Sequence, residues 1–324
     1  MRRILALGCG LALVACLLVG CMAADDERGN DVQQEAGLPE LPDDIETDAD
    51  GVPTIKVYIV EKDTIETMDL ETYLLGVVAG EMRNDWPIEA LKAQAILART
   101  YTLKFLDTKD SKYEGADIST DVSEAQAYSA GNINDRVKRA VEETRGIVMA
   151  YEDELPQAWF HAHSGGMTEL PSVALEYDDD PEYLSAVASA ESENAPDDVN
   201  SWTASFTVSE VGKACADSGV ETGDCKTIKI GETGESGRAK TLIVNGKSVS
   251  APSFRINLGA DRLKSTLIES VKIENGRVTF TGRGYGHGVG MSQWGAFALA
   301  EKGATAQTIV SRYFNGVRFV DLWE

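Results

Sequence analysis

Apolar residues recur with helical periodicity between residues 69 and 82. They form one stripe along a helix, at Leu70, Leu74, Val77 and Val78. This spacing places side chains on one buried face, so we predict a helix over 69–82. Continuing the stripe by three or four residues leads to Glu81. A carboxylate therefore occupies a position where the pattern favours a core residue.

The chain around this helix alternates between strand and helix patterns. Residues 54–61 alternate and are rich in β-branched side chains, which predicts a strand. A tight connection leads to a second helix over 87–106, with proline in its first turn, so that the two helices form a hairpin. We predict a third helix over 134–146, and a β-hairpin over 147–164.

From Ser201 onward the pattern changes to short strands separated by turn signals. Asn245-Gly246 and Asn275-Gly276 are typical of tight β-hairpin turns, and the C-terminal stretch is helical in pattern. We therefore predict an α+β fold in which the helical hairpin that carries Glu81 packs on a mostly antiparallel sheet. A β-rich insert at about 200–270 belongs to the same domain, 54–324.

Residues 1–21 have the organisation of a lipoprotein-type signal peptide. Two arginines precede seventeen residues without a charge, and Cys21 follows. Leu18-Val19-Gly20-Cys21 resembles the lipobox of bacterial lipoproteins, in which the cysteine carries the lipid. We therefore expect an extracytoplasmic protein that is anchored to the membrane through Cys21. An uncleaved anchor is the alternative, although a membrane-spanning helix needs ~20 apolar residues.

Acidic residues dominate the next segment, 22–53, and the chain as a whole. The segment has eleven acidic residues, one arginine and three prolines, and the full chain has a net charge of −23. Such a composition buries too little apolar surface to fold, so we predict a disordered linker. The acidity argues against nucleic acid as a partner.

Five cysteines are present, of which only Cys215 and Cys225 lie in the domain. They are ten residues apart in a stretch rich in glycine and aspartate. Outside the reducing cytosol this spacing predicts a local disulfide bond. Zinc is the weaker alternative, because two thiols without a nearby histidine make only half of a site.

Glu81 is the first candidate for chemistry. Partial burial would raise the pKa of its carboxyl group and keep a proton available near neutral pH. Lys92 and Arg99 lie seven residues apart, on one face of the second helix, and the hairpin would bring that face towards Glu81. The alternative is a glutamate at a frayed helix end that reaches water or caps a neighbour.

A glycine-rich stretch over 282–295 is the second candidate. It contains Tyr285, His287 and Gln293 among six glycines, which let a backbone approach a ligand closely. Aromatic and amide side chains suit sugar recognition by stacking and hydrogen bonds. The alternative is a structural turn before the last helix.

The third candidate is the stretch over 159–169. His161 and His163 alternate along a predicted strand, and Ser164 begins the following loop. Two histidines at this spacing can hold a metal, although a third ligand is not evident. A hydrolytic triad through Ser164 is disfavoured because the nucleophile elbow G-x-S-x-G is absent. We favour a substrate-binding surface on which these residues meet the glycine-rich stretch.

Four blocks of the chain resemble a known family in their order and spacing. They are similar to stage II sporulation protein D and the related amidase-enhancer proteins: LETYLLGVVAGEM…WPIEALKAQAILARTYTL, FHAHSGGMTE, FRINLGADRLKST and GRGYGHGVGMSQWGAFALAEKGATAQTIVSRYFNGVRF. The resemblance implies a lytic transglycosylase that cuts peptidoglycan glycan strands after an amidase has removed their stem peptides. It implies that Glu81 is the catalytic acid and that Arg99 takes part.

The resemblance also has limits. Arg83 stands where family members often have proline. Some members hold zinc with histidines and cysteines near the HSGG segment, but this chain has no cysteine there, so we predict no metal and no cofactor.

A single carboxyl group is sufficient for the implied reaction. Ordinary glycosidases use two, whereas a lytic transglycosylase uses the 6-hydroxyl of the muramic acid as the nucleophile and leaves a 1,6-anhydro end. Lys92 or Arg99 would bind the lactyl carboxylate or stabilise ionised Glu81. The rival hypothesis is a glycan-binding enhancer that stimulates a cell-wall amidase without cutting. A zinc hydrolase through the three histidines is a third.

Overall fold

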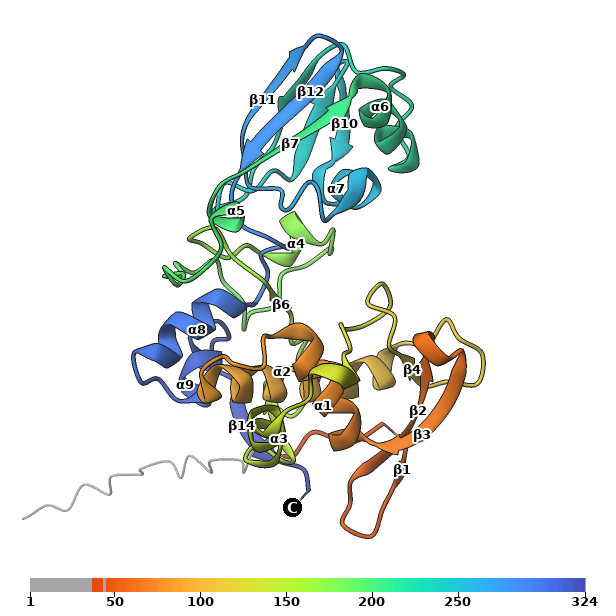
Figure 1. Cartoon of the computed structure of the whole chain (residues 1–324), viewed down its shortest axis with the longest axis vertical. Helices are drawn as coiled ribbons and strands as arrows, with labels where there is room; N and C mark the ends of the chain where they lie inside the picture. Colours follow the sequence, from red (N-terminus) through yellow and green to blue (C-terminus); the bar gives the residue numbers. More distant parts are fainter. Residues whose placement is uncertain (1–36, 43–44, 324) are drawn as a thin grey trace, which may run out of the picture. The chain divides into compact units, whose positions relative to one another are not determined.

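The long helix α2 (Ile88–Thr108) runs through the larger of two hydrophobic cores (Figure 1). The structure is a computed structural model that describes residues 37–42 and 45–323. Helix α2 contacts five other elements: α1 (Leu70–Glu81), α3 (Asp135–Glu142), β5 (Ile147–Ala150), α8 (Gln293–Glu301) and α9 (Ala306–Ser311). Its alanines, and its leucines except Leu106, are buried. Both residue types have high helix propensity, which is why its composition predicts a helix so clearly.

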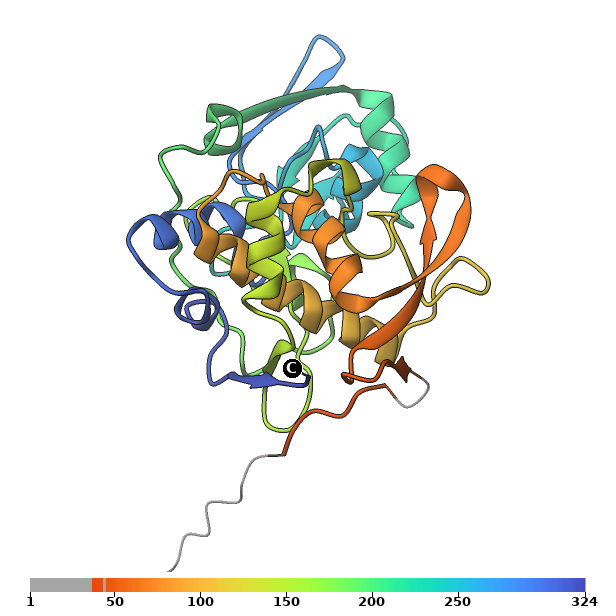
Figure 2. The same cartoon turned by 60° about the horizontal axis from the view of Figure 1, so that its bottom comes forward.

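A small sheet precedes the helical hairpin and positions it. Strand β2 (Pro53–Ile59) pairs antiparallel with β1 (Glu46–Thr47) and with β3 (Thr64–Asp69), and parallel with β4 (Ile118–Ser119). Asp69 ends β3 and caps α1 by accepting the backbone N–H of Thr72 at 2.9 Å. The sheet and α1 lie side by side in both views (Figures 1 and 2).

The predicted linker is too long at its C-terminal end. Residues 46–47 pair with residues 53–54 in the sheet, and Val52 is buried. The acidic composition hid this strand, because a two-residue edge strand with exposed side chains gives no apolar pattern. The rest of the predicted linker that precedes residue 37, together with the signal segment and Cys21, lies outside the described residues.

The predicted β-hairpin over 147–164 is wrong. Strand β5 pairs antiparallel with β14 (Arg318–Asp321) near the C-terminus, whereas β6 (Phe160–His161) pairs parallel with β13 (Met291–Ser292). Only an isolated bridge joins Tyr151 to Glu154. Both partner strands lie more than a hundred residues away in the sequence, so the local pattern contained no information about them.

The region after Ser201 has its own hydrophobic core. One sheet has the order β11–β12–β7, and another has the order β10–β9–β8 (Figure 1). The strands are β7 (Trp202–Thr207), β8 (Ile228–Ile230), β9 (Thr241–Val244), β10 (Lys247–Ser250), β11 (Ile268–Glu274) and β12 (Arg277–Gly282). The hairpins β9–β10 and β11–β12 turn at the predicted Asn-Gly pairs, where all four residues have positive φ.

Several helices in this half of the chain were not predicted. Helix α6 (Val208–Asp217) begins at a capping box between Thr207 and Glu210, and α7 (Ala251–Gly259) has proline in its first turn. Four short helices lie before Ser201: η1 (Val60–Lys62), η2 (Ala130–Asn132), α4 (Pro171–Ala174) and α5 (Asp197–Asn200). The α+β class with mostly antiparallel pairing is confirmed.

The predicted disulfide bond is not formed. Cys215 on α6 and Cys225 are both free and buried in the second core. The thiol of Cys225 points to the carbonyl oxygen of Thr227 at 3.7 Å. Burial raises the pKa of both thiols, to about 11 for Cys225, so both act as small apolar side chains.

Within residues 37–42 and 45–323, no helix is both long and apolar enough to cross a bilayer.

Candidate functional site

Glycines on α1 let a second segment cross the helix at its C-terminal end. A Cβ at Gly76 would lie 2.1 Å from the ring of Tyr128, and one at Gly80 would lie 2.7 Å from the backbone of Ala127. Segment 127–128 therefore packs directly on the backbone of α1. This contact brings the backbone N–H of Ala127 to Oε1 of Glu81, at 2.6 Å.

Glu81 is the last residue of α1 and is half-buried. Burial raises the pKa of its carboxyl group to about 7, against opposing effects of the hydrogen bonds from Ala127 and Gln293. The group is therefore close to half protonated at neutral pH. Its Oε2 has one long contact, to Nε2 of Gln293 at 3.4 Å, so this oxygen has a free direction in which to hold the proton. The helix α1 extends as far as Glu81.

Gln293 brings the glycine-rich stretch to Glu81. It is the first residue of α8, and its Nε2 also lies 3.3 Å from Oε1 of the buried Gln94 on α2. Burial raises the pKa of Tyr101 on α2 to about 12. The negative charge of Glu81 contributes to this rise as a smaller cause. The hydrogen-bond donors to Glu81 are a backbone N–H and a side-chain amide.

Arg99 is not a neighbour of Glu81, contrary to our expectation. Its guanidinium is fully buried and binds both carboxylate oxygens of Glu71, at 2.9 and 2.6 Å, and the carbonyl of Ile147. Glu71 also accepts the indole N–H of Trp323 at 3.0 Å. Glu71 and Glu81 lie at opposite ends of α1, which separates them by ~15 Å along the helix. The guanidinium therefore joins α2 to α1 and β5, while Glu71 also binds Trp323 near the C-terminus.

Lys92 is also engaged elsewhere. Its ammonium group lies 2.9 Å from Glu89 and 2.5 Å from Glu143, which follows α3. The spacing of Lys92 and Arg99 on one helix face was interpreted correctly. The error lay in the direction of that face, which packs against α3 and β5 and not towards Glu81.

The three histidines lie close together: His161 and His163 are buried, and His287 is half-buried. The rings of His161 and His287 are 5.7 Å apart, and each has an Nδ1 that contacts the backbone of Val289, at 3.0 Å. Nδ1 of His163 accepts the N–H of Gly165. Burial is the largest effect on all three and lowers their pKa values, to about 3 for His287. They are neutral and order two adjoining loops.

Metal binding by these histidines gains no support from the geometry. Across the part of the chain that the structure describes, no group of three histidine, cysteine or acidic side chains is arranged to hold an ion.

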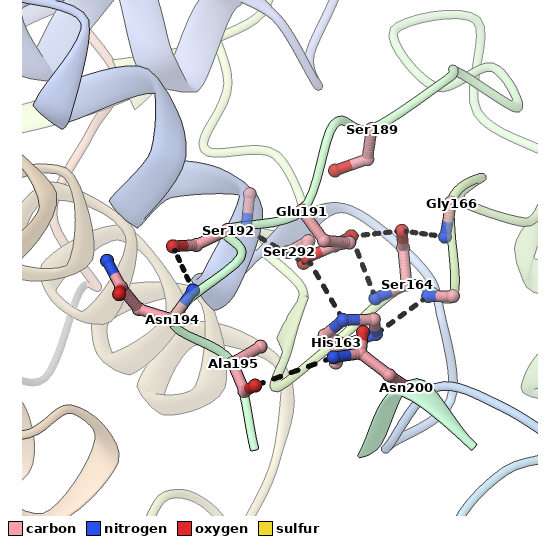
Figure 3. Close-up of polar contacts among 12 residues, drawn as sticks. His163, Ser164, Gly166, Ser189, Glu191, Ser192, Asn194, Ala195, Asn200 and Ser292 are labelled. Atoms are coloured by element: carbon pink, nitrogen blue, oxygen red, sulfur yellow. Dashed lines mark hydrogen bonds and ion pairs between the residues drawn. The ribbon is translucent and has the colours of Figure 1, made fainter. Parts of the chain in front are cut away.

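Ser164 is buried and engaged by Glu191, so it is not placed to contact a glycan (Figure 3). Tyr285 is half-buried; its backbone pairs with that of His163, and the ammonium of Lys264 lies 5.6 Å from its ring centre. Among the predicted binding residues, Gln293 is therefore the one that meets Glu81.

Sequence reasoning missed two buried charged residues near these loops. Arg238 donates to the carbonyls of Ser164 and His287, at 2.9 and 3.1 Å, so it ties both loops to the β-rich region. Its pKa is lowered to about 10 by burial. Glu191 joins Ser164 to Ser292. Neither residue lies in a periodic pattern or a recognisable motif, so the sequence offered no signal for them.

Comparison with known proteins bears on this arrangement. Residues 59–151 match a family described as Stage II sporulation protein (SpoIID), and residues 158–290 match a Domain of unknown function (DUF8618). The chain is 31% identical to Stage II sporulation protein D of Bacillus amyloliquefaciens over 317 residues, which cover 90% of this chain and 87% of that protein. The chain belongs to the stage II sporulation protein D family.

Other relatives agree with this membership. Stage II sporulation protein D of Bacillus subtilis is 30% identical over 332 residues, which cover 95% of this chain and 92% of that protein. The Amidase enhancer of Bacillus subtilis is 29% identical over 75% of this chain but only 39% of its own length. The family-defining match over 59–151 includes α1, Glu81 and α2.

Proposed function

We propose that this stage II sporulation protein D family member is a peptidoglycan lytic transglycosylase in which Glu81 is the acid and base. The observation that carries the proposal is the half-buried carboxyl group of Glu81 at the end of α1, whose pKa is raised to about 7. A group that first gives and then takes a proton works best when its pKa lies near the working pH.

The proposed reaction has two proton transfers at one carboxyl group. Glu81 donates the proton on Oε2 to the glycosidic oxygen as the bond to the anomeric carbon of the muramic acid breaks. The carboxylate then removes the proton of the 6-hydroxyl of the same muramic acid, whose oxygen bonds to the anomeric carbon. The products are a shortened strand and a 1,6-anhydromuramyl end, and no water is consumed.

The N–H of Ala127 and the amide of Gln293 support the ionised state between these transfers. Both donate to the carboxylate and both lower its pKa, although less than burial raises it. Because of this balance, the carboxyl group can first donate a proton and then accept one. The substrate would be strands without stem peptides, prepared by a cell-wall amidase.

The proposed location is the outer face of the cytoplasmic membrane. This proposal rests on the lipobox-like Leu18-Val19-Gly20-Cys21 in the sequence, and a lipid on Cys21 would hold the enzyme near newly processed wall. The physiological role would be cell-wall remodelling or sporulation.

The similarity to the Amidase enhancer favours one competing function. In that case the protein would grip glycan and stimulate an amidase without cutting. Stimulation of an amidase that survives Glu81→Gln would favour the enhancer, whereas stimulation that disappears with Glu81 would favour cleavage.

Product analysis tests the proposal itself. Peptide-free glycan strands are incubated with the purified full-length protein, and the fragments are identified by mass spectrometry. We expect 1,6-anhydromuramyl ends, with the same yield in the presence of a chelator. Reducing ends would indicate a hydrolase, loss of activity in chelator would indicate a metal enzyme, and uncut glycan would leave the enhancer function.

A further inference from the structure

Glu191 lies between α4 and α5, and its carboxylate is the point where other segments of the chain meet (Figure 3). Oε1 accepts the backbone N–H of Ser164 at 3.1 Å, and it also accepts the hydroxyl of that residue. The hydroxyl of Ser292 lies 3.0 Å from Oε1 and 2.8 Å from Oε2. Nε2 of His163 is 4.0 Å from Oε2. The side chain of Glu191 is only 9% exposed, so these contacts are made away from bulk water.

Ser292 transmits this contact to helix α8. It is the N-cap of the helix, and its Oγ accepts the N–H of Gly295 at 3.2 Å while its hydroxyl donates to Glu191. Gln293 follows as the first residue of α8 and contacts Oε2 of Glu81. Two bonds at Ser292 thus fix the turn from which the amide of Gln293 extends.

The segment that carries Glu191 contacts α8 at a second point. The hydroxyl of Ser189 bonds to that of Tyr313 at 2.9 Å, and a Cβ at Gly295 would lie 2.1 Å from the Tyr313 oxygen and 2.4 Å from the Ser189 oxygen. The first turn of α8 therefore has no room to shift towards this segment. The hydrogen bonds from Ser292 to the carboxylate of Glu191 oppose movement of this turn away from the segment.

We propose that Glu191 is a positioning residue: by holding Ser292 it keeps the amide of Gln293 on the carboxyl group of Glu81. The kinetic consequences rest on the proposed function of Glu81, whereas the positioning itself does not. Glu191 acts through α8, so its effect should require Gln293.

The charge environment of Glu81 makes this positioning measurable. Tyr73 of α1 and Tyr101 of α2 are the titratable groups whose pKa values its charge affects, and burial holds both pKa values well above 10. Both phenols therefore stay neutral where Glu81 titrates. The hydrogen bond from Gln293 favours the charged form of Glu81. Loss of that bond should raise the pKa of Glu81.

The first test is a carboxyl ¹³C NMR titration of the full-length protein with labelled glutamate, assigned with Glu81→Gln. We expect Glu191→Ala and Gln293→Ala each to raise the pKa of Glu81, by roughly half a unit. The double variant should show no further rise, because both changes remove the same bond. An unchanged pKa in Glu191→Ala, or additive rises in the double variant, would overturn the proposal.

Two further variants separate positioning from folding. Glu169→Gln is the control, because the carboxylate of Glu169 is also buried (1% exposed) but binds Ser236 and not Ser292 at the start of α8. We expect this substitution to leave the pKa of Glu81 unchanged. If Glu191→Ala does not fold, Glu191→Gln keeps the side-chain volume and should give a smaller rise in the same direction. A rise of equal size in Glu169→Gln would show a general loss of structure and would contradict positioning.

Kinetics on peptide-free glycan give the second test. We expect Glu191→Ala and Gln293→Ala each to lower kcat roughly tenfold, with the double variant equal to Gln293→Ala alone. Multiplied losses would contradict the proposal. If the wild type does not cut glycan at all, the proposed function fails, while the titration still decides the role of Glu191.

Discussion

The two ends of helix α1 each carry a buried or half-buried glutamate, and the two side chains have opposite surroundings. Glu71 meets the guanidinium of Arg99, an indole N–H and a backbone N–H. Glu81 meets one backbone N–H and one amide. The comparison shows that burial of a carboxylate does not by itself mark a catalytic group. The presence or absence of a countercharge separates the structural end of this helix from the end that is suited to proton transfer.

The largest expected effect is on activity at the Glu81 end. Glu81→Gln keeps the size of the side chain but cannot donate the proton, so we expect the rate of glycan cleavage to fall by about 10³-fold or more. The rate of fragment release measures this loss, and a thermal melt checks that the variant is folded. A variant that kept a tenth of the wild-type rate would show that Glu81 is not the acid.

At the Glu71 end the expected effect is on folding. Arg99→Ala would leave the carboxylate of Glu71 buried without its countercharge, which should lower the free energy of unfolding by about 3–5 kcal/mol. Urea denaturation measures the loss. The resemblance implied a part in catalysis for Arg99, and Arg99→Lys separates the two roles. If it stays folded, we expect near-normal kcat, and a loss as large as that of Glu81→Gln would contradict our assignment.

The pH dependence of stability should distinguish the two ends further. The pKa of Glu81 rises from 4.5 to about 7 on folding, so the folded state binds more protons than the unfolded state between these values. Stability contributed by this group is therefore present below pH 4.5 and is lost as the pH rises through 7. Because Glu81 is partly exposed, we expect a loss of about 1–3 kcal/mol.

Thermal melts from pH 5 to pH 8 measure this effect. Glu81→Gln should be more stable than the wild type at pH 8, with the difference shrinking towards pH 5. Equal pH slopes for the two proteins would contradict the raised pKa of Glu81.

The smallest expected effect concerns Gly80, the glycine of α1 that precedes Glu81. Gly80→Ala would place a Cβ 2.7 Å from the backbone of Ala127, so segment 127–128 must move and its bond to Glu81 must lengthen. We expect a loss of roughly 1–2 kcal/mol in stability and a further rise in the pKa of Glu81. Gly131→Ala is the matched control, because a Cβ there meets nothing within 4 Å. Equal effects of the two substitutions would contradict close packing at Gly80.

The sequence predicted those parts of the site that depend on short-range patterns. The apolar stripe of α1 and the composition of α2 placed Glu81 at the end of the first helix of a hairpin, and the Asn-Gly pairs placed two turns. The glycine-rich stretch was a candidate because of its composition, and its Gln293 contacts Glu81. These features arise from residues that are close together in the chain or from recognisable blocks.

Long-range pairing accounts for the parts that the sequence did not predict. The face of α2 that carries Arg99 could be identified, but its partner Glu71 could not, since periodicity does not say which elements will pack together. The same reason explains the missed pairing of β5 with β14 and the role of Glu191, whose partners are 27 and 101 residues away.

The most direct test of the central contrast is the titration of Glu81 in the wild-type protein. In the carboxyl ¹³C NMR titration, the resonance that disappears in Glu81→Gln should have its midpoint near pH 7. Such a midpoint would show that burial without a countercharge keeps this carboxyl group ready to donate a proton. A midpoint near 4.5, the ordinary value for glutamate, would contradict the account.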